Sequence, residues 1–115
     1  MSHDPNCIFC KISKGEIPSS IFYQDDEVIA FHDIRPAAPV HFLIVPREHI
    51  PRLQDSGSDH QALLGKMLLL APKLAAEQGV TNGFRVVINN GEDGGQEVYH
   101  LHVHVMGGPR PWKIG

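Results

Sequence analysis

The sequence has little that would direct the chain to a membrane or to nucleic acid. Its longest apolar run, from Met67 to Ala71, is far shorter than the ~18 residues that cross a bilayer. The formal net charge is −3 and no run of like charges exceeds Asp25 to Glu27, so no basic patch is available to bind phosphates by counterion release. The N-terminal segment also lacks the charged and apolar regions of a signal peptide. We therefore expect neither a membrane nor a nucleic-acid partner.

The sequence also has few cysteines. The chain of 115 residues has only Cys7 and Cys10, which excludes a disulfide-stapled fold and predicts a reducing compartment, the cytoplasm. The length suits a single domain over residues 1–115, with a flexible N-terminus at 1–6 and a C-terminal tail at 107–115. Against this background the chain has eight histidines, and histidine both titrates near neutral pH and binds metals more often than any other side chain.

The spacing of apolar residues predicts an α+β domain with an antiparallel sheet. β-rich runs separated by tight turns indicate strands, and apolar residues at 63, 64, 67, 68, 71, 74 and 75 form one stripe at helical spacing. We expect Ser58 to cap this long helix, Pro72 to kink it and Gly79 to end it. The predicted elements are a short helix at 7–17 stopped by Pro18, strands at 21–23, 28–31, 42–45, 84–88 and 98–106, and the long helix at 59–78.

Three histidines alternate with apolar residues in the last predicted strand. Because a strand has a period of two, His100, His102 and His104 share one face with neighbours about 7 Å apart, and the residues between them enter the core. One interpretation is a polar outer face of the sheet. Two others are chemical: the rings bind a catalytic metal, or the middle imidazole is a nucleophile that attacks phosphorus and forms a covalent intermediate. The spacing alone leaves these alternatives open.

A glycine-rich loop before this strand favours phosphate chemistry. Gly94 and Gly95 can turn backbone N–H groups toward an anion, and Asn89 adds a neutral donor. Such donors suit a phosphoryl group better than a bare metal. Asp33 lies in the loop after the second predicted strand, where the ordinary interpretation of an aspartate is that it caps a turn.

Two segments resemble a known family. Residues 100–106 read H-L-H-V-H-V-M, the pattern of the histidine triad (HIT) family. Residues 31–46 and 94–108 extend the likeness and resemble the Hint branch, the purine nucleoside phosphoramidases. The resemblance covers nearly the whole chain and implies a HIT-like fold, with five antiparallel strands, one long helix and one short helix. It also implies a homodimer in which the two sheets join into one of ten strands.

The resemblance assigns roles to the matching residues. His102 would be the nucleophile that becomes nucleotidylated, and His41 would contact His102 and help to set its tautomer. His104 and Asn89 would hold the phosphoryl oxygens, together with backbone N–H groups near Gly95 and Val98. Asp33 would accept hydrogen bonds from the ribose hydroxyls. The nucleobase pocket would consist of Ile8, Phe9, Ile12, Phe31, Ile34 and Leu43.

Glu97 departs from the eukaryotic Hint pattern, in which a serine commonly stands before V-Y-H and contacts the leaving amine. A carboxylate at this position would still accept a hydrogen bond from an amine. It would also repel an acidic leaving group, so Glu97 bears on which leaving groups the protein accepts.

Cys7 and Cys10 have the C-x-x-C spacing of half a zinc site, which needs two further ligands to be tetrahedral. A redox motif would need a thioredoxin-like context, and two buried free thiols are the remaining alternative. In zinc-bearing relatives, a histidine after the third strand and the first triad histidine complete the set. The resemblance thus implies a closed structural zinc site of Cys7, Cys10, His49 and His100. His3, His32 and His60 fall outside both sites.

Together with the resemblance, these patterns predict an enzyme. It would be a nucleotide-binding hydrolase that cleaves the P–N bond of purine nucleoside phosphoramidates, such as AMP joined to an amine, without a catalytic metal. AMP, GMP and adenosine phosphoramidates are the expected small-molecule partners. Two alternatives stay open at this point: hydrolysis of dinucleoside polyphosphates or adenylyl sulfate, and a zinc-stabilised nucleotide-sensing or protein-interaction module.

Overall fold

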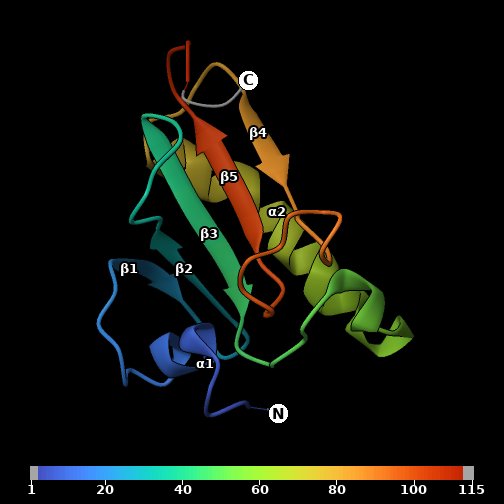
Figure 1. Cartoon of the computed structure of the whole chain (residues 1–115). Helices are drawn as coiled ribbons and strands as arrows, with labels where there is room; N and C mark the ends of the chain where they lie inside the picture. The colour runs from blue at the N-terminus through green and yellow to red at the C-terminus, as the bar shows by residue number, and fades with distance from the viewer. Residues whose placement is uncertain (1–2, 113–115) are drawn as a thin grey trace.

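The fold is an antiparallel sheet with a helix packed against each face (Figure 1). The computed structural model describes residues 3–112. The strands are β1 Ile21–Gln24, β2 Val28–His32, β3 Val40–Pro46, β4 Phe84–Val87 and β5 Val103–Gly107. Their order across the sheet is β1-β2-β3-β5-β4, and every neighbouring pair is antiparallel. The predicted five-stranded α+β fold is therefore confirmed.

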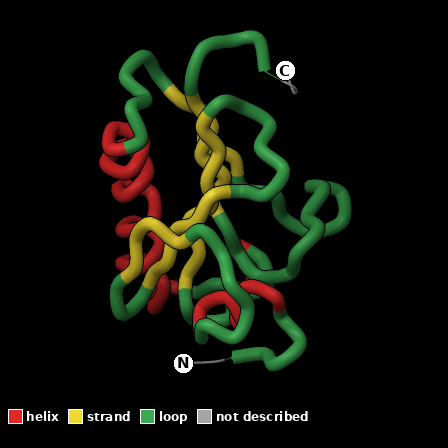
Figure 2. Tube along the Cα trace, turned by 90° about the vertical axis from the view of Figure 1, so that its left-hand side faces the viewer, coloured by secondary structure: helices red, strands yellow, loops and turns green. Residues whose placement is uncertain are grey.

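Alternating side chains of the central strands separate two apolar cores. The long helix α2, Gln61–Glu77, covers one face of the sheet, and the short helix α1, Ile8–Ser13, packs on the other. Figure 2 shows α2 on one side of the sheet and long loops on the opposite side. The α2 side receives Val28, Ala30, Phe42 and Ile44, and the α1 side receives Ile29, Phe31, Leu43 and Val45. His41 has the parity of Leu43, and His104 lies opposite Leu43 in register, so both histidines lie on the α1 side.

Helix α1 is shorter than predicted. It begins at Ile8, where the Sγ atom of Cys7 accepts a hydrogen bond from the N–H of Cys10, and it ends at Ser13 rather than at residue 17. Gly15 has a φ of 77°, the left-handed conformation that commonly follows the end of a helix. The helix therefore stops before Pro18, and the residues up to β1 form a loop.

Helix α2 begins later than predicted and without the expected cap. Ser58–His60 forms a 3-10 turn, so His60 rather than Ser58 precedes the α-helix, and no side chain caps it. Pro72 lies inside the helix, and Gly79 follows its end with a φ of 84°, as expected. None of the helices within residues 3–112 has the length and apolar character that a membrane span requires.

The buried stripe of α2 differs from the predicted one. Leu70 is buried although it was not assigned to the stripe, whereas Leu68 is 48% exposed. The reason is that the helix rests on the sheet through a face that includes Met67, Leu70 and Leu74, which places Leu68 to one side of the contact.

Strand β5 is shorter than the predicted 98–106 because its first residues are not paired in the sheet. The ladder with β3 begins at Val103. Before it, the N–H of Leu101 donates to the carbonyl of Ile50 and the N–H of His100 to that of Val98. The alternation nevertheless continues, since Leu101 is buried in the α2 core while the rings of His100 and His102 contact Phe9 of α1.

Candidate functional site

A cavity of ≈ 510 Å³ brings the predicted nucleotide-site residues together. Residues of α1, of the loop after β2 and of the glycine-rich loop before β5 surround it, and side chains of β3 and β5 also line it. Every residue to which the resemblance assigned a nucleotide-binding role is in its lining: Ile8, Phe9, Ile12, Phe31, Asp33, Ile34, His41, Leu43, Asn89, Gly95, Glu97, Val98, His102 and His104. The roles of these residues stay predictions.

Part of the lining does not follow from the sequence patterns. Ile17, Pro18 and Ser19 line the cavity because α1 ends early and the chain loops past its mouth. His32, expected to lie outside both sites, also lines it. Conversely, Ile34 is 90% exposed, so it lies at the rim rather than in an enclosed apolar pocket.

The hydrogen bond of His102 determines which of its ring nitrogens has the lone pair. Nδ1 lies 2.7 Å from the carbonyl oxygen of His100, and because a carbonyl only accepts, Nδ1 carries the proton. The lone pair of the neutral ring is then on Nε2. Burial lowers the pKa of His102 below its ordinary value, since desolvation disfavours the cation. His102 is thus a neutral imidazole with its lone pair on Nε2.

A chain of hydrogen bonds determines the tautomer of His104 in the same way. The N–H of Ala37 donates to Nδ1 of His41 at 2.9 Å, so the proton of neutral His41 is on Nε2. Nε2 of His41 lies 3.0 Å from Nδ1 of His104 and donates to it. His104 therefore carries its own proton on Nε2, where it is a hydrogen-bond donor available to a ligand.

This arrangement corrects the expectation that His41 contacts His102. His41 lies opposite Met106 in the β3–β5 ladder, so His104 is its diagonal neighbour on the same face, whereas His102 precedes the ladder. The structure thus pairs His41 with His104. The tautomer of His102 is set by the backbone carbonyl of His100 instead.

Burial keeps this pair of imidazoles neutral. It lowers the pKa of His104 to about 4 and also lowers the pKa of His41, against the opposing effect of the Asp33 carboxylate. Oδ1 of Asp33 accepts the N–H of Arg35 at 2.8 Å, and Oδ2 lies 3.4 Å from Nε2 of His41. Asp33 therefore has one carboxylate oxygen engaged by the backbone and one beside the imidazoles.

The glycine-rich loop is held in place by a buried glutamine. Oε1 of Gln96 accepts the N–H of Gly91 at 2.9 Å, and Nε2 donates to the carbonyls of Pro51 at 2.7 Å and Val98 at 3.0 Å. A Cβ atom on Gly94 would lie 2.3 Å from the carbonyl oxygen of Asn90, so only glycine fits there. The loop is thus a fixed element beside the histidines, as an anion site built from backbone N–H groups requires.

Four side chains between α1 and the end of β3 form a candidate metal centre. One donor atom each of Cys7, Cys10, His49 and His100 lies within 4.8 Å of the others. Nδ1 of His100 is 3.2 Å from Sγ of Cys7, 3.5 Å from Sγ of Cys10 and 3.3 Å from Nδ1 of His49. Tetrahedral zinc with bonds of ~2.0–2.3 Å has ligand atoms roughly 3.3–3.8 Å apart. The distances fit the predicted ligand set.

The chemistry of these donors also fits a cation. Nε2 of His100 donates to the carbonyl of Pro46 at 2.7 Å, which leaves the lone pair on Nδ1 facing the cysteines, as metal-bound histidines usually do. Burial raises the pKa of the Cys10 thiol to about 11, and a bound cation would be needed to stabilise its thiolate. The centre adjoins the cavity, because the ring of Phe9 contacts both His100 and His102.

An α+β fold whose antiparallel sheet brings His102 and His104 to one cavity is the arrangement expected of a histidine triad protein. The sequence comparison agrees, since the HIT domain family matches residues 14–110. The chain belongs to the HIT domain family.

Individual relatives give the same result. The chain is 52% identical over 104 residues to Protein HitA of Neisseria gonorrhoeae, covering 90% of this chain and 97% of the relative. It is 49% identical over 102 residues to Purine nucleoside phosphoramidase of Escherichia coli K12, covering 88% and 86%. The solved HIT family hydrolase from Legionella pneumophila matches with a TM-score of 0.88 at 47% identity, over 91% of this chain and 95% of that one. These relatives agree with the family match in placing the chain among the HIT proteins.

Proposed function

We propose that the protein hydrolyses the P–N bond of purine nucleoside phosphoramidates and releases a purine nucleotide, such as AMP, and a free amine. The observation that carries the proposal is the fixed tautomer of His102, which lines the cavity with its lone pair on Nε2. The 49% identity to Purine nucleoside phosphoramidase supports the same substrate class. Glu97, which also lines the cavity, favours a leaving amine over an acidic leaving group.

In the first step, Nε2 of His102 attacks phosphorus. A bond forms between Nε2 and phosphorus, and the bond from phosphorus to the amine nitrogen breaks. That nitrogen takes up one proton from solvent and departs as the free amine, which leaves a nucleotidylated imidazolium. The Nε2–H of His104 donates to a phosphoryl oxygen, and the backbone N–H groups of the Gly95–Val98 loop and the side chain of Asn89 stabilise the charge that develops there.

In the second step, water attacks phosphorus of the nucleotidyl-histidine. The bond to Nε2 breaks, the water releases one proton to solvent as the P–O bond forms, and His102 returns to the neutral state. The His100 carbonyl holds the Nδ1 proton throughout both steps, so the ring that leaves is in the tautomer that attacked.

The nucleoside would occupy the part of the cavity away from the histidines. Asp33 would accept the ribose hydroxyls through its free carboxylate oxygen. The base would lie against Phe9, Phe31 and Leu43, which are buried side chains of the α1 core.

Zinc would be held by Cys7, Cys10, His49 and His100 and would supply no reacting group. With four protein ligands the site has no open position for substrate, as in structural zinc sites. Its proposed role is structural, because it would join α1, which contains Phe9, to the segment that contains His102. Thiolate ligands need a reducing compartment, and we propose that the protein is cytoplasmic.

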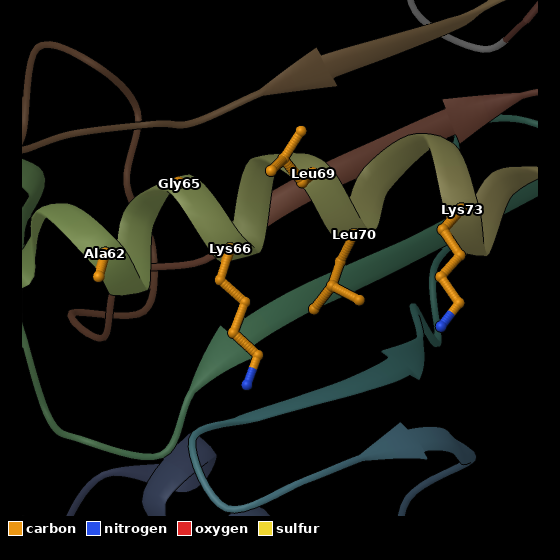
Figure 3. Close-up of a pocket in the computed structure, with 6 residues that line it drawn as sticks. All are labelled: Ala62, Gly65, Lys66, Leu69, Leu70 and Lys73. Carbon is orange, nitrogen blue, oxygen red and sulfur yellow. The ribbon is translucent and has the colours of Figure 1, made fainter.

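We also propose a homodimer joined along β4. Among the described strands, β4 pairs only with β5, and it exposes Phe84 by 38% and Val86 by 39%. The outer surface of α2 is apolar as well, with Leu68 and Leu69 exposed by 48% and 76%. Figure 3 shows Leu69 on the opposite side of α2 from Lys66 and Lys73. An unpaired edge next to an apolar surface is typical of a covered interface. Sedimentation at micromolar concentration should give a dimer, and a monomer would contradict this proposal.

The tail at 107–115 would reach the partner's cavity, with Trp112 as an anchor. Within the chain, Nε1 of Trp112 donates to the carbonyl of Gly108 at 3.1 Å, and the guanidinium of Arg110 lies 4.5 Å from its ring centre. The rest of the predicted tail, 113–115, lies outside the described residues.

Intact-protein mass spectrometry tests the proposed reaction. Mixing the protein with an adenosine phosphoramidate should add one adenylyl group to His102, and the His102→Ala variant should lose both the adduct and turnover. The His60→Ala variant, which changes a histidine outside the cavity, should keep both. Normal turnover by His102→Ala would refute the nucleophilic role. Faster hydrolysis of a dinucleoside polyphosphate or adenylyl sulfate than of the phosphoramidate would refute the substrate assignment.

A further inference from the structure

We propose that Asp33, His41 and His104 form a second, exchangeable transition-metal site, and that a metal bound there excludes the nucleoside from the cavity. The metal-binding part stands on geometry alone, whereas the inhibitory part rests on the proposed function. The site shares no residue with the cysteine centre.

The three donor atoms are already at metal-ligand spacing. Nε2 of His41 lies 3.0 Å from Nδ1 of His104 and 3.4 Å from Oδ2 of Asp33, and all three atoms lie within 4.8 Å of one another. A tetrahedral ion with bonds of ~2.0–2.2 Å to nitrogen and oxygen has ligands roughly 3.3–3.6 Å apart. Small movements of these side chains would therefore create three of the four ligand positions.

The hydrogen bonds show which of the three donor atoms have a free lone pair and which one carries a proton that must leave. Nδ1 of His104 already has a lone pair that points at His41, and Oδ2 of Asp33 is the oxygen that Arg35 leaves free. Only the proton on Nε2 of His41 must leave, and it would pass to solvent as the metal binds. The backbone N–H of Ala37 continues to hold the opposite nitrogen of His41, as the outer partners of metal-bound histidines do.

This donor set selects the class of metal. Two imidazoles and one carboxylate suit zinc, cobalt, nickel and copper, whereas magnesium and calcium prefer all-oxygen sites. Three protein ligands leave one position open, as in exchangeable sites and unlike the closed cysteine centre.

Competition with the nucleoside follows from Asp33. Oδ1 accepts the N–H of Arg35, and Oδ2 is the oxygen that we assign to the ribose hydroxyls. A metal on Oδ2 would occupy that oxygen and place an ion, with the ligand in its open position, where the ribose would bind. Metal and nucleoside should therefore exclude each other, and the metal should raise KM without lowering kcat.

The test uses the zinc-loaded protein, so that the cysteine centre is filled, and adds Co²⁺. We expect one further Co²⁺ per chain, with visible bands of nitrogen and oxygen ligation and without the thiolate-to-cobalt bands of the cysteine centre. AMP should displace this Co²⁺. The isosteric Asp33→Asn variant and His41→Gln should each weaken its binding at least ~10-fold, the scale on which even supporting residues affect metal affinity.

His60 provides a matched control, because its Nε2 lies 2.9 Å from Oε2 of Glu48 outside the cavity, so it too is a histidine beside a carboxylate. His60→Gln should bind the second Co²⁺ as the unchanged protein does. The proposal is overturned if no second equivalent binds, if Asp33→Asn binds it equally well, or if the only Co²⁺ spectrum shows thiolate bands. Co²⁺ binding that AMP does not displace would overturn the competition. These binding measurements need no turnover, so failure of the proposed hydrolysis leaves their outcome readable.

Discussion

Removal of the His41 side chain should weaken catalysis only through His104. The Ala37 N–H bonds Nδ1 of His41, and Nε2 of His41 in turn bonds Nδ1 of His104. In His41→Ala the ring of His104 loses the donor that keeps its own proton on Nε2. The ring then samples both tautomers and orientations, and only some of them present an N–H to the phosphoryl group.

The size of the effect follows from the donor that is lost. Removing one preorganised donor to a developing oxyanion costs roughly 10²–10³ in turnover, which sets the loss expected for His104→Ala. His41→Ala keeps that ring and should lose no more. If the two residues acted independently, their fold losses in turnover would multiply to about 10⁴–10⁶ in the double variant. The losses of residues that act through one another do not multiply. We expect the double variant to equal His104→Ala.

The assay is kcat/KM for an adenosine phosphoramidate over the four proteins of the cycle. Nitrogen chemical shifts of the imidazoles report the tautomer directly, and His104 should change from an Nε2–H ring to a mixture in His41→Ala. His60→Ala should leave both readouts unchanged. The reasoning would be refuted if His41→Ala lost more kcat/KM than His104→Ala, or if the two losses multiplied in the double variant. Either result would indicate that His41 acts on His102.

Three further predictions concern the metal centre, pH and the leaving group. Metal removal, or Cys7→Ser with Cys10→Ser, should lower the melting temperature by at least ~10 °C in calorimetry, because the free energy of metal binding is also free energy of folding; an unchanged melting temperature would contradict the centre. The pKa of His104 is about 4, against an ordinary 6.5, and the neutral ring is both the active and the folded form. As pH falls from 6.5 toward 4, the unfolded chain takes up protons that the folded chain does not, so the free energy of unfolding should fall in denaturant titrations. Over the same range His104 should stay neutral and keep its hydrogen-bond donor. A free energy of unfolding that rises as pH falls would contradict the assignment. Glu97→Gln should speed hydrolysis of substrates with acidic leaving groups relative to amines, and an unchanged ratio of kcat/KM would remove Glu97 from the leaving-group site.

The elements follow from the sequence where a period is long and its ends have clear signals. The apolar runs at 28–31 and 42–45 predict β2 and β3, and Gly79 predicts the end of α2. Boundaries fail where tertiary contacts decide them. Gly15 ends α1 before Pro18 can, and residues 98–102 keep the alternation of a strand although their backbone bonds lie outside the sheet.

Part of the cavity lining also follows from the sequence, because every residue predicted for the nucleotide site lies in it. The partner of His41 does not. Which histidine it meets depends on the register of β3 against β5, where His41 is paired with Met106 and lies diagonal to His104. A family pattern predicts which sequence positions form the site. It does not predict histidine tautomers, because these depend on individual hydrogen bonds such as that from His102 to the His100 carbonyl.

The stereochemical course at phosphorus tests the central claim most directly, because it does not depend on trapping an intermediate. A substrate made chiral at phosphorus with one sulfur atom is hydrolysed in isotopically labelled water, and the configuration of the product is determined. Attack by His102 followed by water inverts phosphorus twice, so the account predicts net retention. Net inversion would mean that water attacks directly, and it would contradict a nucleotidyl-His102 intermediate.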